Sequence, residues 1–599
     1  MKTLSALALA LALSATMVTF PALGAKPAAG MVLGTAALQL DDLAERYYQQ
    51  KAGFNPLTAT LKGDNSFDAQ LPMTMRPEVR ARMFAMLKKM RRQLAQIDIG
   101  KLDGASRTTY DLLSYDINEM LRFEPFDDYL LPMSHLEVLP VTVAGFGTGQ
   151  GSQALTTVAD YEIYAKRVAA LTAWSDASIG AMRTGIKKGV VQPRTLVLGL
   201  IPQLKTLAAT PLEQSNFYAP IRNMPAAFSA ADRTRLTSLY RRTVREALLA
   251  MGKLAAFVET DYLAAARTSS GLGALPNGAQ WYRAHVANHT SSSLEPEEIH
   301  RVGLAEVARL TDEFAKVGVA LGYTGPPARL AAWMRQQAKF RPFRSEQEII
   351  DAFGKINDRI GQQLPTLFGK LPRSKLVIRT EPAISRASAH ERYDQASADG
   401  LRPGIFWAVI PDPALYGSTR MTSLLLHEAS PGHHLHFSLQ LEMSIPKFRR
   451  FGSVNAFSEG WGLYAETLGK EMGLYEDANA YAGHLLMDMM RAARLVVDTG
   501  LHAKGWTREQ TIKYLMETAG DSESSATSYT ERYMAWPGQA LSYKIGALKI
   551  MELRLRAVNA LGSKFNLAKF HDKVLAEGNL PLTILESKLD AWIAEQARL

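Results

Sequence analysis

Residues 427–436 read HEASPGHHLH, and this stretch decides how the rest of the chain is interpreted. It holds four of the 12 histidines of the protein and directly follows the apolar residues 424–426. A histidine next to a glutamate after a buried helical turn offers a metal ligand beside a carboxylate that can take a proton from metal-bound water. The stretch therefore predicts a helix that carries a metal site.

The spacing of the histidines requires a break in this helix. His433 lies six residues after His427, about 240° around an unbroken helix, and His434 returns to the same face roughly 10 Å further along. Neither can share a metal with His427 across an intact helix, because metal–nitrogen bonds are only about 2.0–2.1 Å long. Pro431 and Gly432 supply the break, since proline removes a helical donor and glycine tolerates unusual backbone angles. We predict His427 and His433 as ligands and leave His434 open as the alternative to His433.

A second motif, FSEGWGLYAE, follows at residues 457–466. In zinc peptidases with a glutamate ligand, the third ligand is a carboxylate on a second helix downstream, and Glu459 fits that place. Glu466 returns to the same helix face seven residues later, where it could accept a hydrogen bond from a ligand histidine. Gly460 and Gly462 would allow this helix to approach the metal helix closely. Glu459 is therefore the predicted third ligand, with Glu466 as its support.

The two motifs together, HExxPGHH and EGWxxYxE, resemble those of a bacterial family of unknown function, domain-of-unknown-function family 885, whose members are predicted zinc metallopeptidases. The resemblance extends over most of the mature chain. The matching stretches include residues 282, 289–290, 298–300, 393–404, 494–502, 505–507, 532–533 and 537–544. The resemblance implies a mostly helical fold, similar to that of helical oligopeptidases and carboxypeptidases, with a zinc site in a deep cleft and a small sheet edge near it.

We expect an exported metallopeptidase that holds one Zn²⁺ per chain, with a water in the fourth position and Glu428 as the general base. Tyr543 or His502 would support the oxyanion of the tetrahedral intermediate, although His502 could equally be a buried structural histidine. Arg494, Asp498 and His502 recur at helical spacing, so a salt-bridged helix surface would explain the first two without a function.

Several further residues are candidates for contacts to a short-peptide substrate or for support of the site. Arg532 could bind a substrate carboxylate through its bidentate fork, although a structural ion pair explains it equally well. Lys544 and His434 belong to the same group of candidates. We also expect residues 404–410, with Trp407, to form an edge strand on which a peptide could pair its backbone.

Other readings of the sequence lead to different functions. His285 and His289 have the spacing of two ligands on one helix face, but no glutamate follows His285, so packing roles are favoured. The glycine-rich residues 145–151 follow a strand-like run at 138–144, yet they lack the dinucleotide and P-loop patterns. A mononuclear iron oxygenase would use the same ligand types, and a non-catalytic exported binding protein for peptides or solutes would need no metal.

The 599 residues have 47% hydrophobic and 21% charged side chains, the balance of a globular protein with a large core. Residues 1–25 have the layout of a secretory signal peptide, so we expect a periplasmic or secreted protein. We also expect residues 26–599 to form one helical domain with two lobes about a cleft and its catalytic motifs within 390–550. No cysteine is present to form a disulfide or carry a lipid.

The net charge of +10 comes from scattered basic residues, so no nucleic-acid partner is expected. No stretch after the signal approaches the roughly 20 consecutive apolar residues of a spanning helix, so no membrane insertion is expected after signal cleavage. The oligomeric state cannot be predicted from these features. Apolar residues at spacings of three and four predict helices at 77–98, 104–122, 157–188, 229–268, 296–321, 345–370, 478–504 and 537–558. Strands are predicted at 375–379 and 404–410.

Overall fold

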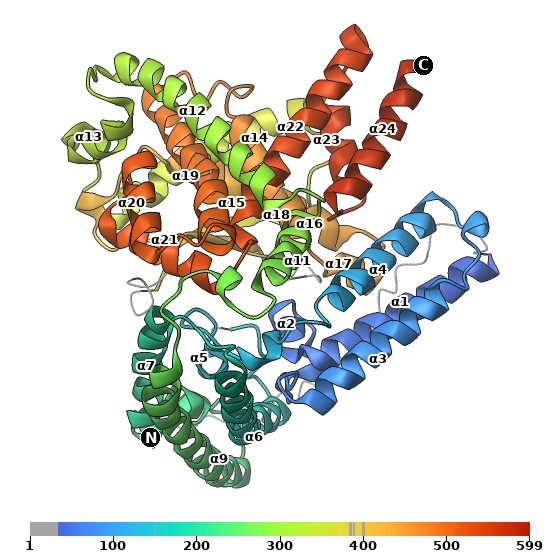
Figure 1. Ribbon diagram of the computed structural model, residues 1–599, viewed down its shortest axis with the longest axis vertical. Coiled ribbons are helices and arrows are strands. Elements are labelled where there is room, and N and C mark those ends of the chain that lie inside the picture. The colour runs from blue at the N-terminus through green and yellow to red at the C-terminus, as the bar shows by residue number, and fades with distance from the viewer. Residues whose placement is uncertain (1–33, 150, 383–385, 387–389, 398–401, 599) are drawn as a thin grey trace, which may run out of the picture.

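The computed structural model describes residues 34–149, 151–382, 386, 390–397 and 402–598. Helices make up almost all of it, with one small sheet, which confirms the mainly α fold (Figure 1). The predicted signal peptide at residues 1–25 lies outside the described residues. Within the described part, no helix combines the length and the apolar character needed to cross a membrane.

The helices of the first half of the chain occupy the lower part of the view in Figure 1. They are α1 (Thr35–Phe54), α2 (Pro56–Leu61), α3 (Pro77–Leu94), α4 (Gly104–Arg122), α5 (Leu139–Phe146), α6 (Val158–Lys188), α7 (Arg194–Ala209), α8 (Ala219–Arg222), α9 (Ala230–Phe257) and α10 (Leu263–Ala265). Helix α1 packs against α3 and α4, while α9 packs against α6 and α7. Local signals fix several ends, as at α6, where Thr157 and Asp160 form a capping box and Gly189 closes the helix with a left-handed φ of 70°.

The second half of the chain carries the helices that build the site. They are α11 (Gly278–Thr290), α12 (Pro296–Leu321), α13 (Leu330–Gln336), α14 (Glu346–Leu367), α15 (Met421–Glu428), α16 (His433–Glu442), α17 (Lys447–Arg450), α18 (Asn455–Thr467), α19 (Ala478–Ala503), α20 (Arg508–Thr518), α21 (Glu523–Ala535), α22 (Ser542–Leu561), α23 (Leu567–Leu575) and α24 (Leu582–Arg598). Helix α12 lies along α19, and α18 lies along α22. Helix α19 is buried over most of its surface, so it forms the centre of this half of the molecule.

The periodicity of the sequence predicts most of these helices closely. The helices at 104–122 and 296–321 have the predicted bounds. The helix predicted at 229–268 is instead interrupted by a π-helical turn at Val258–Tyr262. The helix predicted from 537 begins only at Ser542, because Gly538 adopts a left-handed φ of 79° that a helix cannot include.

The strand-like run at residues 138–144 does not form a strand, because residues 139–144 belong to helix α5. Val141, Thr142 and Val143 favour a strand by their branched side chains. Pro140 lies in the first turn of the helix, where its fixed φ suits the helix start and its missing N–H costs no hydrogen bond. The position of the proline therefore outweighs the branched side chains.

The three strands form one sheet in the order β1-β3-β2, with β1 at Leu376–Thr380, β2 at Arg392–Asp394 and β3 at Gly404–Ala408. Strand β3 pairs in parallel with β1 and antiparallel with β2. The prediction that residues 404–410 form an edge strand is therefore wrong. Because both sides of β3 are already paired, its backbone cannot receive a peptide as an additional strand.

Candidate metal centre

An interruption of the helix brings two histidines of the HEASPGHHLH motif together. Helix α15 ends at Glu428, and α16 begins at His433. A side chain at Gly432 would place its Cβ 1.9 Å from the carbonyl oxygen of His427, so the turn requires glycine. The indole N–H of Trp461 donates to the carbonyl of Pro431 at 2.8 Å and fixes the turn from helix α18. The break between His427 and His433 is confirmed.

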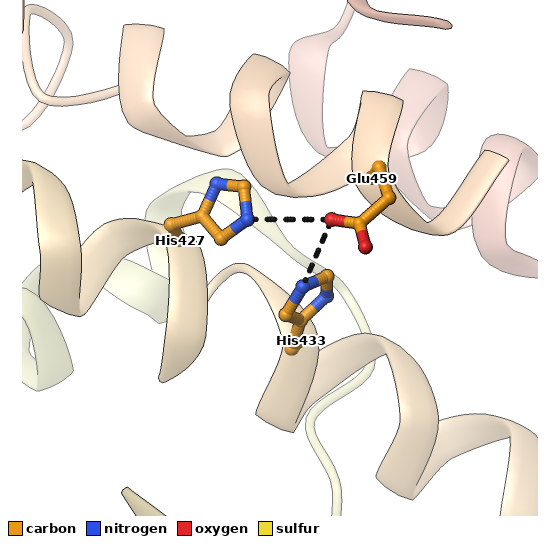
Figure 2. A group of neighbouring side chains, drawn as sticks. All are labelled: His427, His433 and Glu459. Atoms are coloured by element: carbon orange, nitrogen blue, oxygen red, sulfur yellow. Dashed lines mark ion pairs between the residues drawn. The ribbon is translucent and has the colours of Figure 1, made fainter. Parts of the chain in front are cut away.

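His427, His433 and Glu459 come from three helices and converge on one point (Figure 2). The Nε2 atoms of His427 and His433 lie 3.6 and 3.5 Å from Oε2 of Glu459. The three potential ligand atoms all lie within 4.8 Å of one another. Atoms bonded to one tetrahedral zinc at about 2.0–2.1 Å would lie roughly 3.3 Å apart, so the arrangement fits such an ion with little movement.

A buried carboxylate orients the first of these histidines. Nδ1 of His427 donates to Oε1 of Glu466 at 2.9 Å, and Glu466 is completely buried. This hydrogen bond directs the other ring nitrogen, Nε2, toward Glu459. Metal-binding histidines are commonly oriented in this way by a carboxylate on the opposite nitrogen. Glu466 therefore lies where the sequence predicts a residue that accepts a hydrogen bond from a ligand histidine.

The two glycines of the second motif serve two different contacts. A Cβ at Gly462 would lie 2.8 Å from the His427 ring, so this glycine lets the ring rest against helix α18. A Cβ at Gly460 would lie 2.5 Å from the backbone of Gly546, so this glycine permits the close packing of α18 on α22. Only Gly462 faces the metal helix.

The electrostatics of the cluster indicate a place for a cation. Burial lowers the pKa of His427, but the hydrogen bonds to Glu459 and Glu466 outweigh burial and raise it to about 10. Burial raises the pKa of Glu459, but its contacts with His427 and His433 hold it well below the usual range. The buried Glu466 and the partly buried Glu459 thus keep a positive charge between them, as a proton or as a metal ion.

Glu428 directly follows the first ligand and is only partly buried. Burial raises its pKa above that of an ordinary glutamate, and the positive charges of His433 and His427 oppose this rise. No hydrogen bond or ion pair holds its carboxylate within the part of the chain that the structure describes. Glu428 therefore offers a carboxylate beside the ligand set, and no other described side chain binds this carboxylate.

The structure separates the two adjacent histidines that sequence alone left as alternatives. His434 hydrogen-bonds through Nδ1 with the Tyr393 hydroxyl at 3.0 Å, and through Nε2 it donates to the carbonyl of Ser374 at 3.1 Å. Both of its ring nitrogens are engaged on the side of the small sheet. His433 points to His427 and Glu459 instead, and its buried Nδ1 has no hydrogen-bond partner among the described residues. His433 is therefore the histidine that joins the candidate site.

Tyr543 and Arg532 lie together beside the ligand cluster. The Tyr543 ring stacks on the ring of His427 with 6.3 Å between centroids. Nη2 of Arg532 lies 3.4 Å from the Tyr543 hydroxyl and 3.3 Å from Oε1 of Gln539. Among the described residues, no carboxylate oxygen lies within 4 Å of the Arg532 guanidinium. The structural ion pair considered for Arg532 is therefore not formed, since its neighbour Glu531 pairs with Arg508.

His502 has no free ring nitrogen to offer a substrate. Its Nδ1 accepts a hydrogen bond from the backbone N–H of Leu272 at 2.8 Å, and its Nε2 donates to the Tyr533 carbonyl at 3.0 Å. It also lies eleven residues beyond Arg491, roughly 16 Å along α19 from the point where that helix meets Glu466. The prediction that His502 supports an oxyanion is not supported by this placement, because both nitrogens are already used.

The interpretation of Arg494 and Asp498 as a salt-bridged helix surface is wrong. Both side chains are buried, because α19 is enclosed on all sides. Nε of Arg494 donates to the Tyr533 hydroxyl at 3.1 Å, while Asp498 accepts hydrogen bonds from the Tyr282 hydroxyl and from the Gly538 N–H. These two side chains therefore serve different partners.

Lys544 and Trp407 are engaged in contacts within the protein. The Lys544 ammonium is buried and lies 2.6 Å from Asp488 and 2.9 Å from Glu306. Because it is paired with two acids, Lys544 is not free to contact a substrate. The Trp407 indole N–H donates to Asp394 of the neighbouring strand β2 at 2.6 Å. The substrate-binding role considered for either residue is not supported by these contacts.

The pair His285 and His289 is partly buried and packs against neighbouring side chains. Their rings stack on each other with centroids 6.0 Å apart, and His285 also packs against Phe123. The side-chain amide of Asn455 lies 2.8 Å from Nδ1 of His289. The packing role favoured from the sequence agrees with these contacts.

A group on α19 that sequence reasoning missed surrounds Glu466. Nη2 of Arg491 lies 3.7 Å from Glu466 Oε1, and Nδ1 of His484 lies 3.9 Å from Oε2. Asp488, between them, binds Lys544. These three polar residues recur at spacings of four and three within residues 482–493 of the helix, whose other members are apolar or glycine. That polar stripe is the signal by which they could have been found.

The sequence also matches a known protein family. A family model described as "Bacterial protein of unknown function (DUF885)" matches residues 56–589. The chain belongs to this family. The match covers both motifs of the candidate metal centre, so the ligand cluster lies within the region that defines the DUF885 family. No curated protein matches the chain.

Two solved structures share the fold over nearly all of their length. One is described as "the putative lipoprotein from Colwellia psychrerythraea". It is 28% identical, has a TM-score of 0.83, and the match covers 94% of this chain and 99% of that one. The other is described as "a putative lipoprotein of unknown function from Shewanella oneidensis". It is 17% identical, has a TM-score of 0.72, and the match covers 92% of this chain and 99% of that one. The second likeness concerns the fold alone.

Proposed function

We propose that this DUF885 protein is a zinc-dependent metallopeptidase that hydrolyses short peptides. The observation that carries the proposal is the convergence of His427, His433 and Glu459, whose ligand atoms lie within 4.8 Å of one another. Two histidines and a glutamate are a ligand set of catalytic zinc sites, which keep one position for water or substrate. The hydrogen bond from His427 to Glu466 adds the orientation that such ligands need.

The neighbouring side chains fit peptide hydrolysis. Bound zinc would polarise a carbonyl and make its water ligand more acidic. Glu428 would take the proton from the attacking water and return it to the leaving amine. The Tyr543 hydroxyl, beside the ring of His427, would donate a hydrogen bond to the oxyanion. Glu428 favours hydrolysis over oxygenation, because an iron oxygenase built on the same ligand types has no need of a free carboxylate beside its first histidine.

Metal removal tests this proposal directly. We expect the zinc-loaded protein to hydrolyse blocked short peptides, because its ligand set and base are those of a peptidase. Exhaustive chelation should abolish the hydrolysis, and one equivalent of Zn²⁺ should restore it. The measurement is the appearance of new amino groups, with product masses determined by mass spectrometry. Peptide binding without turnover in the zinc-loaded protein would favour the binding-protein alternative instead.

The pH dependence of the reaction should report Glu428. Because burial raises the pKa of this carboxyl above 4.5, its base form is lost at a higher pH than for an exposed glutamate. We therefore expect kcat/KM to fall as the pH is lowered through this raised pKa, with the midpoint of the acid limb above pH 4.5. Zinc content measured at each pH controls for metal loss. An acid limb centred at or below pH 4.5 with zinc retained would contradict the assignment.

We further propose that the mature protein works outside the cytoplasm, in the periplasm or as a secreted protein. Residues 1–25 have the pattern of a secretory signal. The two solved relatives are described as putative lipoproteins, a class of exported protein. An exported peptidase of this kind would act on short peptides present in the cell envelope or the surroundings.

A further inference from the structure

A cavity of about 540 Å³ is lined in part by helix α15, the helix that carries His427 and Glu428. Met421 and Leu424 of helix α15 line it, and His427 and Glu428 follow Leu424 by three and four residues on the same helix. Residues at these spacings lie next to each other on a helix face. The cavity therefore lies next to the helix face that carries the proposed base and the first ligand, and we infer that a substrate bound at the metal extends toward it.

The cavity is lined by three arginines that form no close ion pair among the described residues. Arg335, Arg341 and Arg420 line it, together with the acids Glu391 and Asp521. In the described part of the chain, none of these three arginines has a carboxylate oxygen within 4 Å. Even with Glu391 and Asp521 both ionised, two negative charges face three positive ones. The cavity wall thus carries an excess of positive charge.

Arg532 continues this wall to the metal centre. Ser525 and Tyr529 of helix α21 line the cavity, and Arg532 is one turn further along the same face. Its Nη2 reaches the hydroxyl of Tyr543 at 3.4 Å, while its buried Nε has no hydrogen-bond partner in the described part of the chain. No carboxylate among the described residues comes within 4 Å of it. A partly buried guanidinium without an anion is costly, because it gives up hydration for no ion pair.

A second buried arginine adds to the charge at this place. The guanidinium carbon of Arg494 lies 4.6 Å from the centre of the Tyr543 ring, and no carboxylate of the described chain pairs with it. Arg494 is held by Tyr533 and packed among tyrosine rings, so it does not reach out to a ligand. The charge of Arg494 raises the positive potential around Tyr543. Of the two arginines, Arg532 is therefore the one whose N–H groups can bind a ligand.

We propose that Arg532 binds a carboxylate of the substrate within one or two residues of the scissile bond. This inference rests on the proposed peptidase function and narrows its substrates. Arg532 touches Tyr543, which stacks on the ligand His427, and one extended residue spans only about 3.5 Å. Its planar fork matches a carboxylate through two hydrogen bonds. The carboxylate is either the free carboxyl terminus, which makes the enzyme a carboxyl-terminal exopeptidase, or an acidic side chain.

The test compares matched peptides for binding and for turnover. Four N-blocked tripeptides separate the two sources of the carboxylate: a neutral peptide as free acid, the same peptide as amide, a glutamate-containing amide and its glutamine counterpart. Binding is measured by calorimetry on the zinc-loaded Glu428→Gln variant, which is expected to hold peptides without cleaving them. Turnover is measured on the zinc-loaded wild type. A preference for the free acid assigns the terminal carboxylate, and a preference for glutamate over glutamine assigns the side chain.

We expect one carboxylate-bearing peptide to exceed its neutral partner in affinity and in kcat/KM by about 10- to 100-fold, the usual range for a hydrogen-bonded charged group. Arg532→Gln should reduce this ratio to near one, and Arg532→Lys should retain part of it. Arg301→Gln, an exposed arginine on α12, serves as the control that leaves the ratio unchanged. Thermal melting of each variant verifies folding.

The possible failures can be told apart. A ratio near one in the wild type, or a ratio that Arg532→Gln does not change, would overturn the carboxylate site even if hydrolysis is fast. Selective binding of carboxylate peptides without any cleavage would support the site and contradict the peptidase function.

Discussion

Replacement of Glu428 by glutamine is expected to lower kcat by about 10²- to 10⁴-fold while zinc stays bound, the usual contribution of a general base. Glutamine keeps the size and shape of the side chain but cannot accept the proton of the attacking water. The three ligands come from other positions, so the ligand cluster should keep its geometry. The measurement is single-substrate kinetics together with zinc content per chain.

Two comparisons make this prediction specific. Glu442 lies at the end of helix α16 and pairs with Arg373 at an exposed site, so Glu442→Gln controls for loss of a negative charge near the motif. That control should keep nearly full activity. Undiminished hydrolysis by Glu428→Gln would show that Glu428 is not the general base. Loss of zinc from this variant would show that Glu428 affects activity by helping to hold the metal.

Removal of His433 should abolish zinc binding and activity, whereas removal of its neighbour His434 should abolish neither. Nε2 of His433 faces Glu459 at 3.5 Å, so His433→Ala deletes one of three ligands. We expect the zinc affinity to fall by more than the about 10- to 100-fold that is typical when only a supporting residue is lost. The measurement is zinc affinity by competition with a fluorescent chelator, followed by peptide hydrolysis at saturating zinc.

His434→Ala provides the matched control at the adjacent position. His434 bonds with Tyr393 and Ser374, so its loss should cost about 1–3 kcal/mol of folding stability without affecting the ligand set. Its melting temperature should fall while zinc affinity stays near that of the wild type. If His434→Ala lost zinc and His433→Ala kept it, the ligand assignment would have to be reversed.

The candidate ligand set could be predicted because its signals are local. The distance between His427 and His433 along the chain, together with Pro431 and Gly432, is enough to predict a broken helix. Glu459 and Glu466 share a helix face by spacing alone. The broken helix and the shared face follow from the geometry of a helix and the length of a metal bond, and the choice of Glu459 as third ligand also used the ligand pattern of zinc peptidases.

The roles of residues with distant partners could not be predicted in this way. His502 is occupied by the backbone of Leu272 and Tyr533, and Lys544 by Glu306 and Asp488, which are far from them in sequence. No periodicity in the sequence announces such contacts. The order of the strands was hidden for a similar reason, because β2 is only three residues long and shows no clear alternation.

Much of the fold follows from the hydrophobic pattern, whereas its departures follow from backbone chemistry. Proline at the start of α5 turned a strand-like run into a helix, and the left-handed Gly538 delayed the start of α22. These are effects of single residues on the backbone, and windows of apolar spacing average over them.

The most direct test of the proposed zinc site is the zinc content of the purified mature protein, measured by elemental analysis beside that of Glu459→Gln. Glutamine keeps the shape of the third ligand but removes the negative charge that holds a cation between His427 and His433. We predict about one zinc per chain in the wild type and little in the variant, with both proteins folded. A wild-type protein that binds no zinc after zinc is added, or a variant that binds as much as the wild type, would contradict it.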